Sequence, residues 1–124
     1  MKYTESHEWI EVEGSSGRVG ITKYAQKELG DIVHIELPRL GSMIEVGDEV
    51  AVLESTKAAA DIYSPVSGKV LAVNERLKED LSLLNRDPEG EGWLFQIKLS
   101  DRTELKVLYD QERYLELVGD ESFS

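Results

Sequence analysis

Lys57 is the residue whose type and setting most clearly suggest chemistry. It lies in the four-residue stretch 55–58, between two β-type runs at residues 50–54 and 59–63. If these runs pair antiparallel, the four residues must form the connecting turn. The turn would then present the lysine amine to solvent at the end of a rigid ribbon, where an enzyme can acylate it. Exposed turn lysines are also ordinary surface residues, so the pattern alone leaves both readings open.

Side chains that could build a self-contained active site are sparse. His7 and His34 are the only histidines, there is no cysteine, and His34 lies on an alternating strand where we expect a structural role. We find no glycine-rich phosphate loop, nucleophile elbow or metal-spaced histidine cluster. The many acidic residues read as solvated surface. The sequence therefore predicts neither an enzyme nor a metal site.

Length and charge limit the possible partners. The 124 residues predict one domain, 1–124, with a core at about 3–100 and a helical C-terminal segment at about 101–118. The 25 acidic and 14 basic side chains give a formal charge of −11. Such a surface repels nucleic acid and anionic lipid, which leaves basic faces of other proteins as candidate partners. Residues 1–5 carry no apolar signal core, and we expect a cytoplasmic protein.

Short β-type runs separated by turns dominate the sequence and favour a sandwich or small barrel. A capping Thr22 and a terminating Gly30 predict a helix ending at Leu29, and Asp110 can cap a second helix within 101–118. Residues 46–53 resemble residues 66–73, which suggests two related halves flanking the lysine hairpin. The remaining expected elements are a hairpin of 9–13 with 18–21, strands at 31–37, 49–54, 59–63, 69–73 and 93–99, and a helical turn at 80–84.

Four separate stretches resemble the glycine cleavage H-protein family, in the same order and spacing. They are residues 6–9, residues 19–31, the segment 54–68 around Lys57, and residues 85–94, within a resemblance that runs from about Tyr3 to Tyr114. The resemblance implies a mostly β fold, the barrel-sandwich hybrid of lipoyl and biotinyl carriers, with short helices that include a C-terminal segment.

The resemblance also implies a modification at Lys57. Its amine would carry lipoate in an amide bond, attached by a lipoate ligase or lipoyltransferase. Glu54 and Gly68 match family positions implicated in recognition by that enzyme. Thr56 stands where family members commonly have valine, a nearly isosteric change that we expect modification to survive.

The family works as a shuttle between three enzymes. Its members carry an aminomethyl group from a pyridoxal-phosphate glycine decarboxylase to a tetrahydrofolate-dependent aminomethyltransferase, and electrons to the flavin enzyme dihydrolipoamide dehydrogenase. Ser6, Glu8 and Asp61 match positions that line a cleft for the loaded arm, and Tyr24 stands where some relatives have histidine. The alternative is that these side chains cap nearby backbone groups or are ordinary surface residues. The resemblance thus implies a non-catalytic carrier whose arm is sheltered between transfers.

Three other carriers are weighed against this interpretation. Biotin carriers place methionine on both sides of the lysine, whereas Thr56 and Ala58 stand here. Lipoyl domains of 2-oxoacid dehydrogenases usually have aspartate before the lysine and lack the segment 91–93 and the C-terminal helices. The sequence distinguishes poorly between the glycine cleavage shuttle and an H-like protein that relays lipoate to other carriers. The lipoate relay therefore remains the alternative function.

Overall fold

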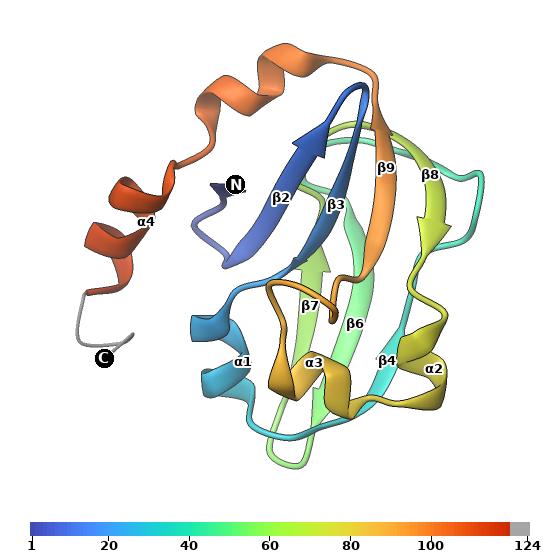
Figure 1. Ribbon diagram of the computed structural model, residues 1–124, viewed down its shortest axis with the longest axis vertical. Helices are drawn as coiled ribbons and strands as arrows, with labels where there is room; N and C mark the ends of the chain where they lie inside the picture. The colour runs from blue at the N-terminus through green and yellow to red at the C-terminus, as the bar shows by residue number, and fades with distance from the viewer. Residues whose placement is uncertain (120–124) are drawn as a thin grey trace.

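Two antiparallel sheets form the body of the molecule in the computed structural model, which describes residues 1–119 (Figure 1). The smaller sheet has the order β4-β6-β7, formed by Ile32–Glu36, Glu49–Ser55 and Ala59–Tyr63. The larger sheet has the order β1-β2-β3-β9-β8-β5, formed by Lys2–Tyr3, Glu8–Glu13, Ser16–Ile21, Phe95–Leu99, Gly68–Val73 and Met43–Ile44. The mostly β sandwich expected from the sequence is confirmed.

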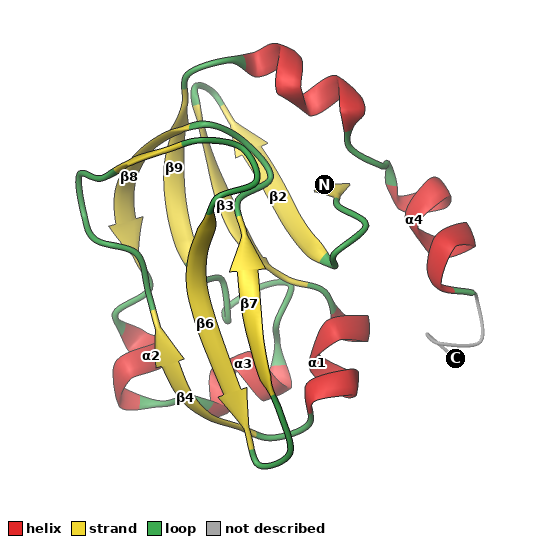
Figure 2. Cartoon of the chain, turned by 180° about the vertical axis from the view of Figure 1, so that it is seen from behind, coloured by secondary structure: helices red, strands yellow, loops and turns green. Residues whose placement is uncertain are grey.

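Helices lie at the ends of this sandwich and along one side of it. They are α1 (Lys23–Leu29), α2 (Arg76–Glu79), α3 (Ser82–Arg86), the 3-10 helix η1 (Arg102–Val107) and α4 (Gln111–Val118). Figure 2 shows α1 and α3 near the end of the sandwich where the β6–β7 hairpin turns. No helix among the described residues has the length and apolar character needed to cross a membrane.

One hydrophobic core joins the two sheets. Alternate residues of the strands point inward, because successive side chains of a strand face opposite sides. The smaller sheet contributes Ala51, Leu53 and Ile62, and the larger sheet contributes Val70 and Ile97 among others, all buried. Each large side chain that is fully buried contributes about 1.5–3 kcal/mol relative to exposure. The lysine hairpin therefore grows from strands that are fixed by the common core.

The local signals at the first hairpin and helix predict their elements correctly. β2 pairs with β3 from Glu8↔Ile21 to Glu13↔Ser16, and the turn contains Gly14 at φ 63°. Thr22 caps α1 by accepting a hydrogen bond from the backbone N–H of Ala25 at 3.2 Å. Because side-chain capping satisfies an otherwise unpaired helix N–H, the sequence marks where this helix begins.

The strand at 32–36 differs from its expected pattern. The sequence predicts alternating faces over residues 31–37, but the pairing with β6 shifts register between Ile32 and His34. The irregularity leaves both Val33 and His34 exposed. A bulge inserts a residue that no partner opposes, and the regular alternation of faces is lost there. The imidazole of His34 consequently lies on the outer face, where its Nε2 is 4.0 Å from a carboxylate oxygen of Glu36.

Other elements also depart from the sequence expectation. The short strands β1 and β5 and the single-turn helix α2 were not predicted, and β9 begins at Phe95 rather than at residue 93. Trp93, just before β9, instead places its ring 4.8 Å from the guanidinium carbon of Arg18. Elements of two to four residues carry too few side chains for a periodic signal. They form here because neighbouring strands and helices supply their partners.

The C-terminal helical segment is confirmed and is divided into two helices. Asp101 caps η1 by accepting from the N–H of Thr103, and Asp110 caps α4 by accepting from the N–H of Arg113 at 2.9 Å. Between the helices, Tyr109 and Tyr3 exchange two backbone hydrogen bonds of 2.8 Å. The chain end is thereby attached to the edge of the larger sheet.

A buried tyrosine holds α4 against the body. The ring of Tyr114 stacks on Tyr3 with centroids 4.7 Å apart. Its hydroxyl lies 2.7 Å from Nδ1 of His7 and 2.7 Å from the hydroxyl of Thr22. Burial raises the pKa of Tyr114 to about 12, so the hydroxyl keeps its proton at neutral pH. One side chain thus connects α4, the start of β2 and the cap of α1.

The hydroxyl contacts of Tyr114 give a test of this connection. Tyr114→Phe should lower the free energy of unfolding by about 1–3 kcal/mol, because it deprives buried polar groups of a partner. Tyr109→Phe is the control, since the Tyr109 hydroxyl makes no hydrogen bond with the described residues. Urea denaturation measures both variants. Equal stabilities for the two would show that the hydroxyl contributes nothing.

Candidate functional site

The β6–β7 turn is closed by a serine side chain. The Ser55 hydroxyl oxygen accepts hydrogen bonds from the backbone N–H groups of Lys57 at 3.2 Å and Ala58 at 3.0 Å. The N–H of Ser55 donates to the carbonyl of Ala58 at 2.7 Å. Serine side chains commonly replace a backbone partner in this way. The turn therefore forms without the Asn-Gly or Asp-Gly pair that usually marks a tight hairpin.

The turn is also attached to the segment that follows α1. The N–H of Thr56 donates to the carbonyl of Asp31 at 3.2 Å. The Lys57 side chain passes beside Gly30, where an added Cβ atom would lie 3.2 Å from Cε of the lysine. Gly30 ends α1 with φ at 82°, and its N–H donates to the carbonyl of Gln26 at 2.9 Å. A residue without a side chain at this position leaves room for the lysine methylenes.

The amine of Lys57 is available for reaction. Lys57 is exposed, and its Nζ makes no hydrogen bond or ion pair with the described residues. An exposed primary amine on a fixed turn can be acylated without unfolding the surrounding chain. The expectation that the lysine stands free at the hairpin end therefore agrees with the structure.

Asn85 is a positioning residue that the sequence analysis did not single out. Its side-chain oxygen accepts from the N–H of Ile32 at 3.2 Å and from the side-chain amide of Gln26 at 3.3 Å. These contacts fix the chain on both sides of Gly30 and Asp31, against which the lysine turn rests. Asn85 lies far from Lys57 in sequence, and its inclusion in a family-like motif was the one available signal.

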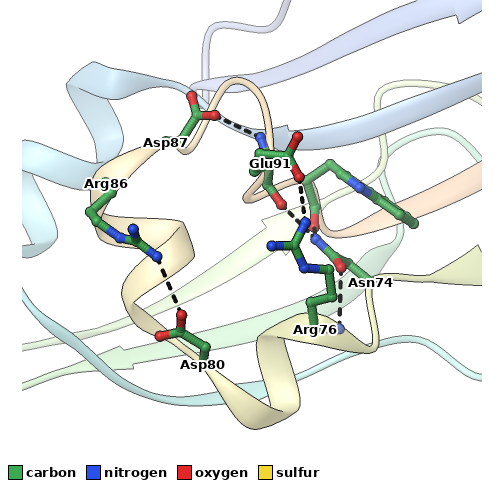
Figure 3. Close-up of polar contacts among 7 residues, drawn as sticks. Asn74, Arg76, Asp80, Arg86, Asp87 and Glu91 are labelled. Carbon is green, nitrogen blue, oxygen red and sulfur yellow. Dashed lines mark hydrogen bonds and ion pairs between the residues drawn. The ribbon is translucent and has the colours of Figure 1, made fainter.

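The segment 85–93 forms a compact braced turn (Figure 3). The carboxylate of Asp87 accepts from the N–H of Glu91 at 2.8 Å, and the Asn74 amide donates to the carbonyls of Glu91 at 2.8 Å and Trp93 at 2.9 Å. An ion pair of 2.6 Å joins Arg76 to Glu91. Because most of these contacts satisfy backbone groups, this motif fixes the path of the chain between α3 and β9.

Glu54 and Gly68, both expected to guide lipoylation, lie in different sheets. Glu54 is exposed on β6 opposite Ala59, three residues before the lysine. Gly68 is buried on β8 opposite Leu99, where an added Cβ would lie 2.0 Å from the carbonyl oxygen of Lys98. Close strand contact thus demands glycine at this position. The structure does not bring the two residues together.

Glu8 and Ser6 lie together at the start of β2. The Glu8 carboxylate is buried, with 1% of the residue exposed, and accepts from the hydroxyls of Thr4 at 2.5 Å and Ser6 at 2.7 Å. Its second oxygen accepts from the N–H of Tyr63 at 3.3 Å. A buried carboxylate needs such donors because desolvation otherwise penalises its charge. Glu8 therefore joins the N-terminal loop to β7, the strand that follows the lysine turn.

Tyr24 lies beside this pair, across the ring of His7. The two ring centroids are 4.6 Å apart, and His7 adopts φ 74°. Burial lowers the pKa of His7, partly opposed by the charges of Glu8 and Glu28. Ser6, His7 and Tyr24 line a shallow pocket of about 490 Å³, which the end of α4 and Glu5 complete. Three of the four expected cleft residues are therefore neighbours.

Asp61 is not among the residues that line this pocket. It is exposed on β7, opposite Val52 of β6. The Asp61 charge, together with a hydrogen bond between the two carboxyls, raises the pKa of Glu49. Among residues 1–119, the link from Asp61 to the other cleft residues runs along β7, since Tyr63 two residues later contacts Glu8.

This combination of fold and exposed lysine defines a class. A hairpin from one sheet of a β-sandwich presents an unpaired amine. Around it lie hydrogen bonds that fix the backbone, and no grouping of acid, base and nucleophile was found near it among the described residues. The arrangement is that of a carrier domain with an accessible lysine at the end of a hairpin.

Comparison with known proteins identifies the family within this class. Residues 1–121 match the sequence profile described as Glycine cleavage H-protein, and the chain belongs to that family. It is 49% identical to the glycine cleavage system H protein of Thermotoga maritima over 120 residues, 97% of each chain. It is 54% identical to that of Aeromonas hydrophila over 122 residues, 98% of this chain and 95% of the other.

A solved structure supports the same assignment. The crystal structure of a glycine cleavage system H protein from Mycobacterium marinum superposes with a TM-score of 0.87 at 32% identity, covering 95% of each chain. The resemblance found in the sequence is confirmed, and the chain is a lipoyl-bearing shuttle and carrier component of a glycine cleavage system.

Substitution of Gly68 tests whether this residue stabilises the fold or is recognised directly by the lipoylating enzyme. Gly68→Ala should lower the free energy of unfolding by about 1–3 kcal/mol, because the new methyl group overlaps the backbone of β9. Lys69→Ala, an exposed neighbour on β8, should change it by less than about 0.5 kcal/mol. The folded fraction of Gly68→Ala should be acylated at the wild-type rate. A variant that is fully stable but acylated slowly would instead assign Gly68 to direct recognition.

Proposed function

We propose that this protein carries lipoate as an amide on Lys57 and moves an aminomethyl group, and then electrons, between the enzymes of glycine cleavage in the cytoplasm. The exposed lysine at the β6–β7 turn is the observation that carries the proposal. The family assignment supports lipoate as the group that this lysine receives. The alternative reading as a biotin carrier has no support in these comparisons.

The residues around Lys57 fit an acyl group of this kind. Thr56, Ala58 and Ala59 have small side chains, and Gly30 leaves the lysine methylenes uncovered. When bound, lipoate supplies a dithiolane that accepts the cargo and can be reduced to a dithiol. Glu54, exposed on the same hairpin, is available to a lipoate ligase or lipoyltransferase. The chain itself supplies tethering, which raises the effective concentration of the cargo at each enzyme in turn.

The partners follow from the proposed cargo. They are a pyridoxal-phosphate glycine decarboxylase, a tetrahydrofolate-dependent aminomethyltransferase and the flavin enzyme dihydrolipoamide dehydrogenase. We assign the reaction steps to these enzymes and none to the carrier. The hairpin has an exposed end and a backbone that is held by hydrogen bonds. This suits the role, because the same end must enter several active sites without a change of fold.

The distance along α1 from Lys57 to the shallow pocket suits the length of a lipoyl arm. Gly30, beside the lysine, and Tyr24, at the shallow pocket, are six residues apart on or next to α1. A rise of 1.5 Å per residue places them about 9 Å apart along the helix axis, a span that an extended lipoyl chain covers. We infer that the loaded arm lies along α1 and β7, toward Ser6, Glu8, Tyr24 and Asp61.

Attachment at Lys57 is tested by intact mass spectrometry. Incubation with a lipoate ligase, ATP and lipoate should add one lipoyl amide to the protein, and peptide mapping should locate it at Lys57. Lys57→Arg keeps the positive charge but lacks a primary amine, so it should gain no mass. Purified glycine decarboxylase then tests the shuttle. Efficient lipoylation without acceptance of the aminomethyl group would favour the lipoate-relay function, and acylation elsewhere would refute the site.

The shelter is tested with two amide variants. Glu8→Gln and Asp61→Asn should both lose the carried aminomethyl group to water faster, because each removes a negative charge near a cationic cargo. Glu8→Gln should also lose about 1–3 kcal/mol of stability, since an amide cannot accept all three hydrogen bonds made to the carboxylate. Because Asp61 is exposed, Asp61→Asn should speed the loss of the aminomethyl group without lowering stability. This variant therefore separates the two effects. Wild-type rates in Asp61→Asn, with Glu75→Gln as control, would exclude its role.

A further inference from the structure

Side chains of the types that bind metal ions lie together on the outer face of the smaller sheet, although they come from two separate segments of the sequence. His34 lies directly opposite Glu54 across the β4–β6 pair, and Glu36 follows His34 by two residues on β4. Residues two apart on a strand share a face, so the three side chains point to the same side. The β4-β6-β7 sheet lies in front of the larger sheet in Figure 2, with this outer face toward the viewer.

We propose that His34, Glu36 and Glu54 form a binding site for a divalent transition-metal ion such as Zn²⁺ or Co²⁺. One ligand atom from each residue lies within 4.8 Å of the other two, and Nε2 of His34 is 4.0 Å from Oε2 of Glu36. A tetrahedral zinc ion with ligand distances of about 2.0–2.2 Å separates its ligands by roughly 3.4 Å. Small rotations of exposed side chains close this difference.

The ligand types select the class of ion. Imidazole binds zinc, cobalt, nickel and copper in preference to magnesium and calcium, while two carboxylates neutralise the charge of a divalent ion. Three protein ligands leave further positions for water, the composition of open rather than closed sites. The sequence alone predicts no metal site, because its two histidines are far apart. The strand pairing supplies the missing ligand, Glu54, from another part of the chain.

The surroundings favour a cation. Among residues 1–119, Glu36 forms an ion-pair contact only with His34, and Glu54 forms none. Asp61 and Glu49 add two further carboxyls to the same sheet, and the charges of Asp61 and Glu36 both raise the pKa of Glu49. No lysine or arginine among residues 1–119 forms an ion pair with either glutamate. The negative potential of the face therefore adds to the attraction for a metal ion.

Direct binding tests the site on the untagged protein without lipoate, independently of the carrier function. Titration with Co²⁺ should give a saturable one-to-one signal in visible absorption. His34→Ala and Glu54→Gln should each weaken it at least about tenfold, the loss that even outer-shell changes cause. Glu112→Gln, an exposed glutamate on α4, should bind as the wild type does. Circular dichroism confirms that the variants stay folded.

A second measurement identifies the ligand atoms. On addition of Zn²⁺, the imidazole nitrogen resonances of His34 should shift, while those of His7, which contacts Tyr114, should not. Absence of saturable Co²⁺ binding, binding that is unchanged in His34→Ala, or shifts confined to His7 would each overturn the proposal. Loss of Co²⁺ binding in both ligand variants together with His34 shifts would establish it.

Discussion

The position of Lys57 depends on one constraint, which is that the backbone N–H groups of the hairpin turn are satisfied without the lysine side chain. The Ser55 hydroxyl accepts two of them and the Asp31 carbonyl accepts a third. Unpaired backbone groups would otherwise seek other partners and loosen the turn. Since Asn85 fixes the chain next to Asp31, the turn rests on a surface that is itself immobilised. The Lys57 amine itself makes no hydrogen bond or ion pair with the described residues.

A carrier of this kind needs many positioning residues for one reactive residue. Several positions that carry the family resemblance serve the backbone: Asn85 and Asp87 accept from N–H groups, and Gly68 permits close contact between β8 and β9. Tyr114 plays a similar part at the other end of α1 through Thr22. Of these residues, Asn85 fixes the segment beside the lysine turn, whereas Asp87, Gly68 and Tyr114 fix other parts of the fold.

Local signals made much of the fold predictable. Capping at Thr22 and Asp110, the terminating Gly30 and the apolar alternation of the hairpin strands all act within a few residues. The bulge at 32–34, the short strands and the link through Asn85 could not be predicted, because they depend on contacts between segments far apart in sequence. The lysine itself illustrates both cases. Pattern reasoning placed it in a turn, whereas the family resemblance was needed to choose modification over an ordinary surface role.

The charge of the chain is consistent with encounters that are specific and brief. Acylation of Lys57 would remove its charge and change the formal net charge from −11 to −12. The sheet that bears Lys57 presents carboxylates from Glu36, Glu54 and Asp61, and it also carries the exposed side chains of Val33 and Tyr63. Complementary charge accelerates association, while the lifetime of a complex is set mainly by its buried contacts. A shuttle must leave each enzyme before it reaches the next. Attraction through exposed carboxylates at the hairpin, rather than through a large apolar interface, meets both requirements.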